Sequence, residues 1–209
     1  MIHGRFITLE GGEGAGKSTQ VLRLAAKLRE QGRDVVMTRE PGGAPGAEAI
    51  RSLLVDGAVD RWDPMTEALL HFAARRNHLE TTIKPALAAG KWVISDRFAD
   101  STMAYQGIVQ GLGRDAVRTL YDLAVGGLAP DLTLVLDLPV DIGLKRAGAR
   151  GGEDRYERMG TAFHERLRDA FLEIVRDNPE RCVLIDATGS EDEVAGLILN
   201  AVEARAMVA

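Results

Sequence analysis

Close to its start the chain reads Gly11-Gly12-Glu13-Gly14-Ala15-Gly16-Lys17-Ser18. This octapeptide fits the pattern G-x-x-x-x-G-K-S/T, in which a glycine-rich backbone turns its N–H groups inward around phosphate oxygens. Lys17 adds a point charge for the outer phosphates, and the hydroxyl of Ser18 is a ligand for Mg²⁺. The stretch therefore predicts a loop that binds a nucleoside triphosphate.

The residues on either side of this loop favour the same interpretation. An apolar run, 6–9, precedes it and is typical of a short strand. Apolar residues recur at helical spacing after it, so a helix N-terminus adds its positive dipole end to the anion site. The alternative, a flexible glycine-rich turn, does not require this context. The loop alone leaves open motor ATPases, GTPases, recombinases and small-metabolite kinases, so the rest of the chain must indicate the acceptor.

Composition limits the class of protein. The chain has 209 residues, 45% hydrophobic and 27% charged, which predicts one α/β domain over 1–209. Its single cysteine, Cys182, and an N-terminus without a secretory pattern indicate the cytoplasm. No apolar run approaches the ~20 residues that span a bilayer, so we expect no membrane partner. A net charge of −5 disfavours long nucleic acids as partners.

Five apolar runs alternate with segments of helical periodicity. This order predicts a five-stranded parallel sheet with helices on both faces, a three-layer α/β/α fold. Pro85 interrupts the long helical segment 66–89 and is expected to bend or split it. The runs are 6–9, 35–37, 92–94, 132–136 and 182–185.

Polar residues follow directly after these runs, where ligands bind in parallel sheets. Arg39 and Arg97 follow the second and third runs and should converge on the same crevice as Lys17. Two guanidinium groups there predict a second phosphate site. The alternative is that each arginine forms a surface ion pair with its neighbour, Glu40 or Asp96.

Two carboxylates compete for the metal. Asp96 ends the third apolar run and Asp137 ends the fourth, and each could instead cap a helix. We favour Asp96, together with Ser18, as the Mg²⁺ site, because the third strand commonly neighbours the strand before the phosphate loop.

A second group of arginines lies in 146–158. Glycines in its middle predict a mobile lid that closes over phosphates. Positive charge aimed at the transferred phosphoryl group is the main catalytic device of such enzymes. Acidic residues are interspersed, so composition does not decide which of Arg146, Arg150 and Arg155 reaches the phosphates.

Several segments together closely resemble the thymidylate kinase family. They are 8–19, Thr38-Arg39-Glu40-Pro41-Gly42-Gly43, Asp96-Arg97-Phe98, Tyr105-Gln106-Gly107, Pro130-Asp131-Leu132-Thr133 and Asp154-Arg155, in the family order. The resemblance implies a nucleoside monophosphate kinase fold of the P-loop NTPase type. It also implies transfer of the γ-phosphoryl group of ATP to dTMP with Mg²⁺, a step in dTTP biosynthesis, by a homodimer.

The resemblance also assigns roles within the phosphate site. It implies that Gly11 to Thr19 bind ATP, with Lys17, Ser18 and Thr19 handling its phosphates and the metal. Arg39 and Arg97 would hold the phosphate of dTMP. Glu13 stands where the family has a carboxylate near the sugar 3′-hydroxyl, which suits an acceptor for that O–H. The loop has no further arginine, which resembles bacterial members, so Arg150 and Arg155 are the leading lid contacts.

The thymine pocket is inferred from Phe72, Arg75, Thr102, Tyr105 and Gln106. An aromatic ring would stack on the base, while arginine, hydroxyl and amide groups read its polar edge. The chain departs from the common family pattern Leu-Phe-x-Ala-x-Arg, because His71 stands where a phenylalanine is frequent. Either Phe72 stacks with Arg75 nearby, or Arg76 replaces Arg75, or Phe72 belongs to the core.

Rival functions remain open from sequence. One is a kinase of another nucleotide or small metabolite on the same sheet. The other is a nucleotide-dependent interaction module without catalysis, which would not need Arg39, Arg97 or a lid.

Overall fold

The computed structural model describes residues 4–149 and 155–205. Its described residues form one five-stranded sheet with the order β2-β3-β1-β4-β5, and all neighbouring strands are parallel. Each strand runs one or two residues beyond the apolar run that predicted it. The strands are β1 (Phe6–Gly11), β2 (Val35–Arg39), β3 (Trp92–Asp96), β4 (Leu132–Asp137) and β5 (Cys182–Asp186).

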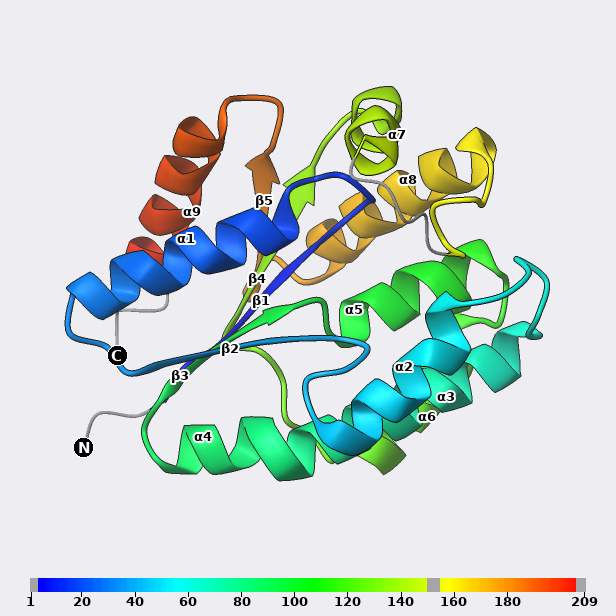
Figure 1. Ribbon diagram of the computed structural model, residues 1–209, viewed down its shortest axis with the longest axis horizontal. Helices are drawn as coiled ribbons and strands as arrows, with labels where there is room; N and C mark the ends of the chain where they lie inside the picture. The colour runs from blue at the N-terminus through cyan, green and yellow to red at the C-terminus, as the bar shows by residue number, and fades with distance from the viewer. Residues whose placement is uncertain (1–3, 150–154, 206–209) are drawn as a thin grey trace.

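Helices cover both faces of the sheet, so the three-layer prediction is confirmed (Figure 1). Helices α1 (Lys17–Glu30) and α9 (Glu191–Arg205) lie together on one face. The opposite face is covered by α4 (Lys84–Ala88), α5 (Ala99–Thr102), η2 (Met103–Val109) and α8 (Thr161–Asp177). Further out lie α2 (Pro45–Val55), α3 (Pro64–His78) and α6 (Arg114–Val125), and α7 (Val140–Gly148) contacts α8.

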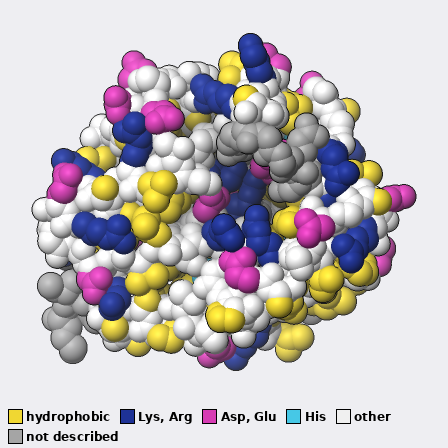
Figure 2. All heavy atoms as spheres, viewed as in Figure 1, with side chains coloured by type: hydrophobic (Ala, Val, Ile, Leu, Met, Phe, Trp, Pro, Cys, Tyr) yellow, Lys and Arg dark blue, Asp and Glu magenta, His cyan; other side chains and the backbone are white. Residues whose placement is uncertain are grey.

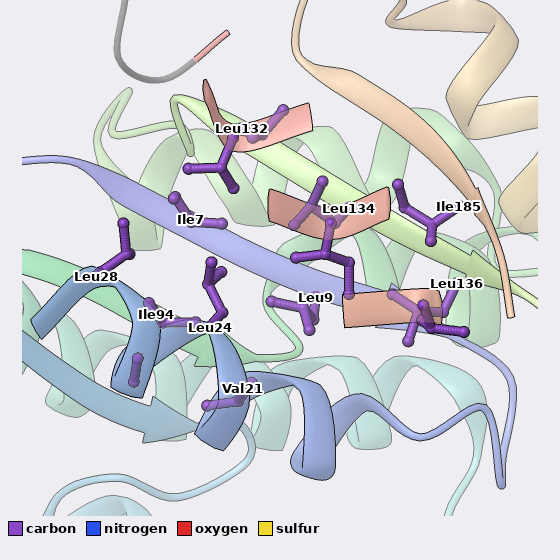
Figure 3. Close-up of a cluster of buried hydrophobic side chains, with 14 of the residues drawn as sticks. Ile7, Leu9, Val21, Leu24, Leu28, Ile94, Leu132, Leu134, Leu136 and Ile185 are labelled. Atoms are coloured by element: carbon purple, nitrogen blue, oxygen red, sulfur yellow. The ribbon is translucent and has the colours of Figure 1, made fainter. Parts of the chain in front are cut away.

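The main hydrophobic core lies between the sheet and α1 (Figure 3). Alternate strand residues point into it, because side chains along a strand alternate between the two faces of a sheet. Residues spaced three and four apart on α1 complete the cluster, as expected for one apolar helix face. The labelled members are Ile7, Leu9, Val21, Leu24, Leu28, Ile94, Leu132, Leu134, Leu136 and Ile185.

The other face of the sheet combines apolar packing with polar contacts. The rings of Phe6 and Phe98 meet edge to face, with their centroids 5.0 Å apart. Further along the strands, the hydroxyls of Thr8 and Thr133 lie 3.0 Å apart and hydrogen-bond. The polar residues on this face continue toward the carboxyl ends of the strands, where the candidate site lies.

The long helical segment is divided as predicted. Helix α3 begins at Pro64, and the carboxylate of Asp63 just before it caps the helix by accepting from the backbone N–H groups of Met65 and Thr66. A π-helical turn, η1 (Leu79–Ile83), separates α3 from α4, and Pro85 lies in the first turn of α4. Proline is tolerated there because it has no N–H to pair.

The phosphate loop lies close against α7. A Cβ on Gly14 would overlap the carbonyl oxygen of Gly143, so this approach requires glycine. Among the described residues, no helix is long and apolar enough to cross a membrane.

Candidate active site

The carboxyl ends of β1, β2 and β3 open into a cavity of about 370 Å³. Lys17, Arg39 and Arg97 all line it, so the predicted convergence of these charges is confirmed. Arg51 from α2 adds a fourth cation that the sequence did not indicate. On the face seen in Figure 2, Lys and Arg side chains gather around a hollow near the centre of the molecule.

Lys17 lies in the first turn of α1 and is buried. Its ammonium group donates to the carbonyl oxygens of Gly11 and Gly12, at 3.2 and 2.7 Å. Burial and then repulsion from Arg97 lower the pKa of Lys17 to about 8, although nearby carboxylates oppose this. The lysine is therefore charged at neutral pH but close to titration.

Ser18 and Asp96 meet at the side of the loop. The Ser18 hydroxyl donates to the Asp96 carboxylate at 2.5 Å, and both residues line the cavity. Hydroxyl and carboxylate oxygens are the donors that Mg²⁺ accepts, with water and phosphates completing its shell. The pair therefore fits the ion, although the described residues contain no cluster of three or more His, Cys, Asp or Glu that could hold a metal.

Asp137, the rival carboxylate, has a different partner. Arg168 of α8 binds it through two hydrogen bonds of 2.6 and 2.9 Å. This bidentate ion pair joins the end of β4 to α8 and satisfies the carboxylate. Asp137 does not line the cavity that contains Ser18 and Asp96.

Arg97 is held in place by three contacts. Its guanidinium donates to Glu13 at 2.7 Å, to the Gly11 carbonyl at 3.0 Å and to Ser101 at 3.1 Å. Its backbone has a φ of 71°, a left-handed conformation that is uncommon for residues other than glycine. Such strain is frequent at functional sites, where the surrounding structure imposes it.

Glu13 balances the charge of Arg97 inside the cavity. Burial alone would raise the pKa of Glu13, but Arg97, Lys17 and the hydroxyl of Tyr105, which donates at 2.6 Å, lower it to about 2. Glu13 is therefore a carboxylate at neutral pH. It lines the same cavity as the predicted phosphate ligands, where it can accept a hydrogen bond from a hydroxyl group.

Arg39 and Arg51 lie at the more open side of the cavity. Arg39 pairs with Glu48 at 3.2 Å, and not with Glu40 as the alternative interpretation held. Its side chain is 56% exposed, so this ion pair is weak and easily exchanged for a phosphate. Arg51 donates to the carbonyl oxygen of Pro41 at 2.7 Å.

Aromatic and neutral side chains form another part of the cavity wall, which Tyr105 joins to the charged part, since the Arg97 guanidinium lies 5.3 Å from its ring centroid. Tyr105 and Gln106, which the sequence predicted, line it, and so do His71 and Tyr156, which it did not assign. The Gln106 amide nitrogen donates to Glu67 at 2.6 Å, and its oxygen is buried without a partner among the described residues.

Phe72 does not line the cavity. It is 3% exposed and packs in the core with Phe6, Leu79 and Phe98, so the interpretation as a core residue is the one that its position supports. Residue 71 faces the cavity in its place. Adjacent residues on a helix point about 100° apart, so only one of the two could face the cavity.

Arg75 and Thr102 lie behind the cavity wall. Arg75 is 2% exposed and donates to Glu40 at 2.7 Å, to the Phe98 carbonyl at 3.0 Å and to Thr102 at 3.1 Å. Its second terminal nitrogen, Nη1, is buried without a partner among the described residues. Arg76 instead lies at the surface beside Glu80, so of the two arginines only Arg75 is near the pocket.

Arg155 does not line the cavity that Lys17, Arg39 and Arg97 border, in contrast to its predicted role. It is fully buried, forms a short ion pair with Glu67 and donates to the carbonyl oxygens of Leu54 and Val59, both at 3.0 Å. These contacts use its donors to join the start of the described segment 155–205 to α2 and α3. The other lid candidate, Arg150, lies outside the described residues.

A second cavity, of about 450 Å³, lies on the other side of the phosphate loop. Gly14 and Gly16 border both cavities, while Ala15 and Thr19 border only the second. Arg146 from α7 and the segment 187–191 after β5 complete its walls. The loop therefore separates two spaces, each large enough for part of a nucleotide.

Glu10 was also missed by sequence reasoning. It is buried in β1 and accepts from the Phe98 N–H at 2.8 Å and from Ser101 at 2.6 Å, which fixes the turn that carries Arg97. Burial and the neighbouring Asp100 raise its pKa to about 7. A glutamate inside an otherwise apolar strand was the available signal, because a buried carboxylate needs specific partners.

A phosphate loop between two cavities, with four cations at the end of one of them, defines a class. The protein is a P-loop nucleotide kinase, in which one phosphorylated molecule faces another across the loop.

Comparison with known proteins gives the particular family. The family model described as thymidylate kinase matches residues 9–198. The thymidylate kinase of Caulobacter vibrioides is 57% identical over 98% of this chain and 99% of its own, and that of Rhizorhabdus wittichii is 54% identical over 95% and 96%. A crystal structure of thymidylate kinase from Ehrlichia chaffeensis aligns with a TM-score of 0.76 and 36% identity, covering 96% of this chain and 99% of that one. The chain belongs to the thymidylate kinase family, which confirms the resemblance and the fold class.

Proposed function

We propose that this protein transfers the γ-phosphoryl group of ATP to dTMP, giving dTDP and ADP as a step toward dTTP. Family membership supports the reaction. The observation that carries the proposal beyond the family is the polarity of the first cavity. Its wall combines four cations with aromatic side chains, and Tyr105 joins the two groups, because the Arg97 guanidinium lies over its ring at 5.3 Å from the centroid. The cations are Lys17, Arg39, Arg51 and Arg97.

A nucleoside monophosphate matches this polarity. Its phosphate would lie among the arginines, and its base would lie between the aromatic walls near Tyr105 and Gln106. Glu13, between the two groups, would accept a hydrogen bond from the sugar 3′-hydroxyl. Arg75 and Thr102 would support the base pocket from behind, and the unpartnered Nη1 of Arg75 is a donor suited to a base carbonyl.

ATP would occupy the second cavity, with its phosphates over the loop Gly11 to Thr19. The backbone N–H groups, the start of α1 and Lys17 would hold the β- and γ-phosphates. Arg146 and the segment 187–191 would surround the nucleoside. This arrangement leaves the loop between donor and acceptor.

The protein's part in the chemistry is positioning and charge neutralisation. A phosphate oxygen of dTMP is the nucleophile and is already ionised near neutral pH, so no strong general base is required. It attacks the γ-phosphorus, its new O–P bond forming as the bond to the ADP oxygen breaks. Arg39 and Arg97 would fix the nucleophile, Lys17 would neutralise developing charge, and Arg150 is our candidate for a lid contact.

Ser18 and Asp96 are the residues that would hold Mg²⁺, directly or through water. The ion would supply positive charge that offsets the negative charge of the phosphates.

We also infer a cytoplasmic homodimer. Leu69 of α3 and Leu123 of α6 are 49% and 82% exposed on two helices that pack together, and exposed leucines on neighbouring helices suit contact with a second copy. Light scattering of the purified protein tests this directly, since a monomeric mass would contradict it.

The reaction is tested by a coupled assay that measures ADP release with dTMP, dUMP, AMP, GMP and CMP as competing acceptors. We expect the highest kcat/KM with dTMP. A preference for AMP or GMP would indicate a different nucleotide kinase. Calorimetry that detects ATP but no dTMP binding would instead favour a nucleotide-dependent interaction module.

A further inference from the structure

A chain of buried hydrogen bonds joins the cavity wall to the end of the lid. The Tyr156 hydroxyl lies 2.9 Å from Nε2 of His71, 3.1 Å from the Glu67 carboxylate and 3.1 Å from the Arg155 guanidinium. Glu67 and His71 are four residues apart on α3, so they share one helix face. His71 and Tyr156 both line the cavity, whereas Glu67 and Arg155 are fully buried behind it.

The partners of Tyr156 determine where its proton lies. Arg155 is a pure donor, so the tyrosine oxygen accepts from it. Two oxygens 3.1 Å apart, one of them in a carboxylate, require a proton between them, so the tyrosine donates to Glu67. Because the tyrosine proton is used in that bond, Nε2 of His71 must supply the proton for the hydrogen bond between His71 and Tyr156. The imidazole is therefore the Nε2–H tautomer.

The imidazole is also uncharged. Burial, followed by the nearby positive charges of Arg75 and Arg155, lowers the pKa of His71 to about 3. A neutral ring is needed at this end of the cavity, because a further cation would attract the phosphate to the wrong end. The negative charge of Glu67 does not make the His71 imidazole cationic, since Glu67 is paired with Arg155 and also accepts from Gln106 and Gln110.

We propose that Tyr156 is a positioning residue for nucleobase recognition, because its hydroxyl holds the His71 imidazole as the neutral Nε2–H form against the base. The inference rests on the proposed function, in which dTMP occupies this cavity. Arg155 and Tyr156 belong to the segment 146–158, which the sequence predicted as a lid, and both contact Glu67.

A double-mutant cycle tests the link. Kinetics are measured for wild type, Tyr156→Phe, His71→Phe and the double variant. Tyr156→Phe should raise the KM for dTMP about tenfold, the size of one hydrogen bond, with the KM for ATP unchanged. In the His71→Phe background the same change should alter the KM for dTMP less than about twofold, because phenylalanine has no tautomer to hold.

Two kinetic outcomes would overturn the proposal. An equal rise in KM in both backgrounds would mean that the tyrosine hydroxyl contacts the nucleotide itself. A fall in kcat with KM unchanged would mean that it acts on the transfer step. Melting temperatures of the four proteins show whether each is folded at the assay temperature.

A second pair of variants serves if Tyr156→Phe does not fold. The glutamine amide in His71→Gln reaches the place of Nε2–H and can donate to Tyr156, whereas the shorter asparagine in His71→Asn cannot. The KM for dTMP should be lower for His71→Gln than for His71→Asn. The reverse order would contradict the proposal.

The tautomer is measured without any substrate. Nitrogen NMR of the ¹⁵N-labelled protein should show His71 protonated at Nε2 in the wild type and a mixture of tautomers in Tyr156→Phe. An Nδ1–H form in the wild type would overturn the positioning role. Absence of dTMP phosphorylation by a wild type that shows the Nε2–H form would instead count against the proposed function, so the two failures are distinguishable.

Discussion

The two ends of the acceptor cavity are built differently. At the phosphate end, Arg39, Asp96 and Arg97 lie at or directly after the ends of adjacent parallel strands, and Lys17 begins α1 after the loop that follows β1. At the base end, His71 and Tyr105 come from α3 and η2, and Tyr156 comes from the segment before α8. The first end depends on topology and the second on how helices pack. The comparison predicts that variants at the phosphate end impair chemistry, whereas variants behind the base end impair stability and dTMP binding.

The largest effect is expected at Lys17. Lys17→Ala should lower kcat by at least about a thousandfold, because it removes the positive charge that neutralises the transferred phosphoryl group. The fold should survive. Lys27→Ala is the matched control, since Lys27 lies on the same helix in a surface ion pair with Glu30. Steady-state kinetics and circular dichroism measure both. Turnover near wild type for Lys17→Ala would contradict the mechanism.

A large loss of stability is expected behind the base end. Arg75→Ala should lower the free energy of unfolding by about 3 kcal/mol, because it removes the guanidinium charge from the buried Glu40 and leaves the carboxylate with His78, at 3.0 Å, as its side-chain partner. Arg76→Ala should change it by less than about 0.5 kcal/mol, since that ion pair is exposed. Urea denaturation distinguishes them. Equal losses of unfolding free energy in the two variants would contradict the view that burial makes the Arg75 ion pair the more important one.

Arg155 provides a sharper test of the same contrast. Its buried ion pair with Glu67 predicts that Arg155→Ala loses about 3 kcal/mol of stability and raises the KM for dTMP. A catalytic lid arginine would instead lower kcat with little change in stability. Measuring kcat and the free energy of unfolding on the same preparation distinguishes a structural Arg155 from a catalytic one. A stable variant with a hundredfold lower kcat would support the catalytic role predicted from sequence.

The smallest effect is a pH dependence at the phosphate end. The pKa of Lys17 is about 8 in the free protein, so its ammonium is lost as pH rises through that value. We expect kcat/KM for ATP to fall about tenfold per pH unit above 8. Lys17→Arg, if active, should lack this fall because arginine does not titrate there. A flat profile for the wild type to pH 9.5 would contradict the pKa.

The phosphate end could be predicted from the sequence because the hydrogen-bonding register of a parallel sheet brings strand ends together. All five strands lie where apolar runs predicted them, and Ser18 contacts Asp96. Arg51 was missed because it belongs to α2, a helix whose placement over the cavity depends on packing and not on strand order.

The base end could be predicted only in part, for a physical reason. Leu70-His71-Phe72 offers two adjacent rings, and periodicity does not decide which one faces the core when helix α3 is buried on several sides. Arg155 was misplaced because charge and glycine content indicate a lid but do not reveal a buried partner on a distant helix. Glu67, the partner, is an ordinary helix residue in sequence and a fully buried carboxylate in the fold.

A crystal structure of the protein with dTMP tests the central claim most directly. The account predicts the phosphate within hydrogen-bond distance of Arg97 and at least one of Arg39 and Arg51, and the thymine ring against His71 and Tyr105. A reversed nucleotide, or dTMP in the cavity beside Arg146, would contradict it.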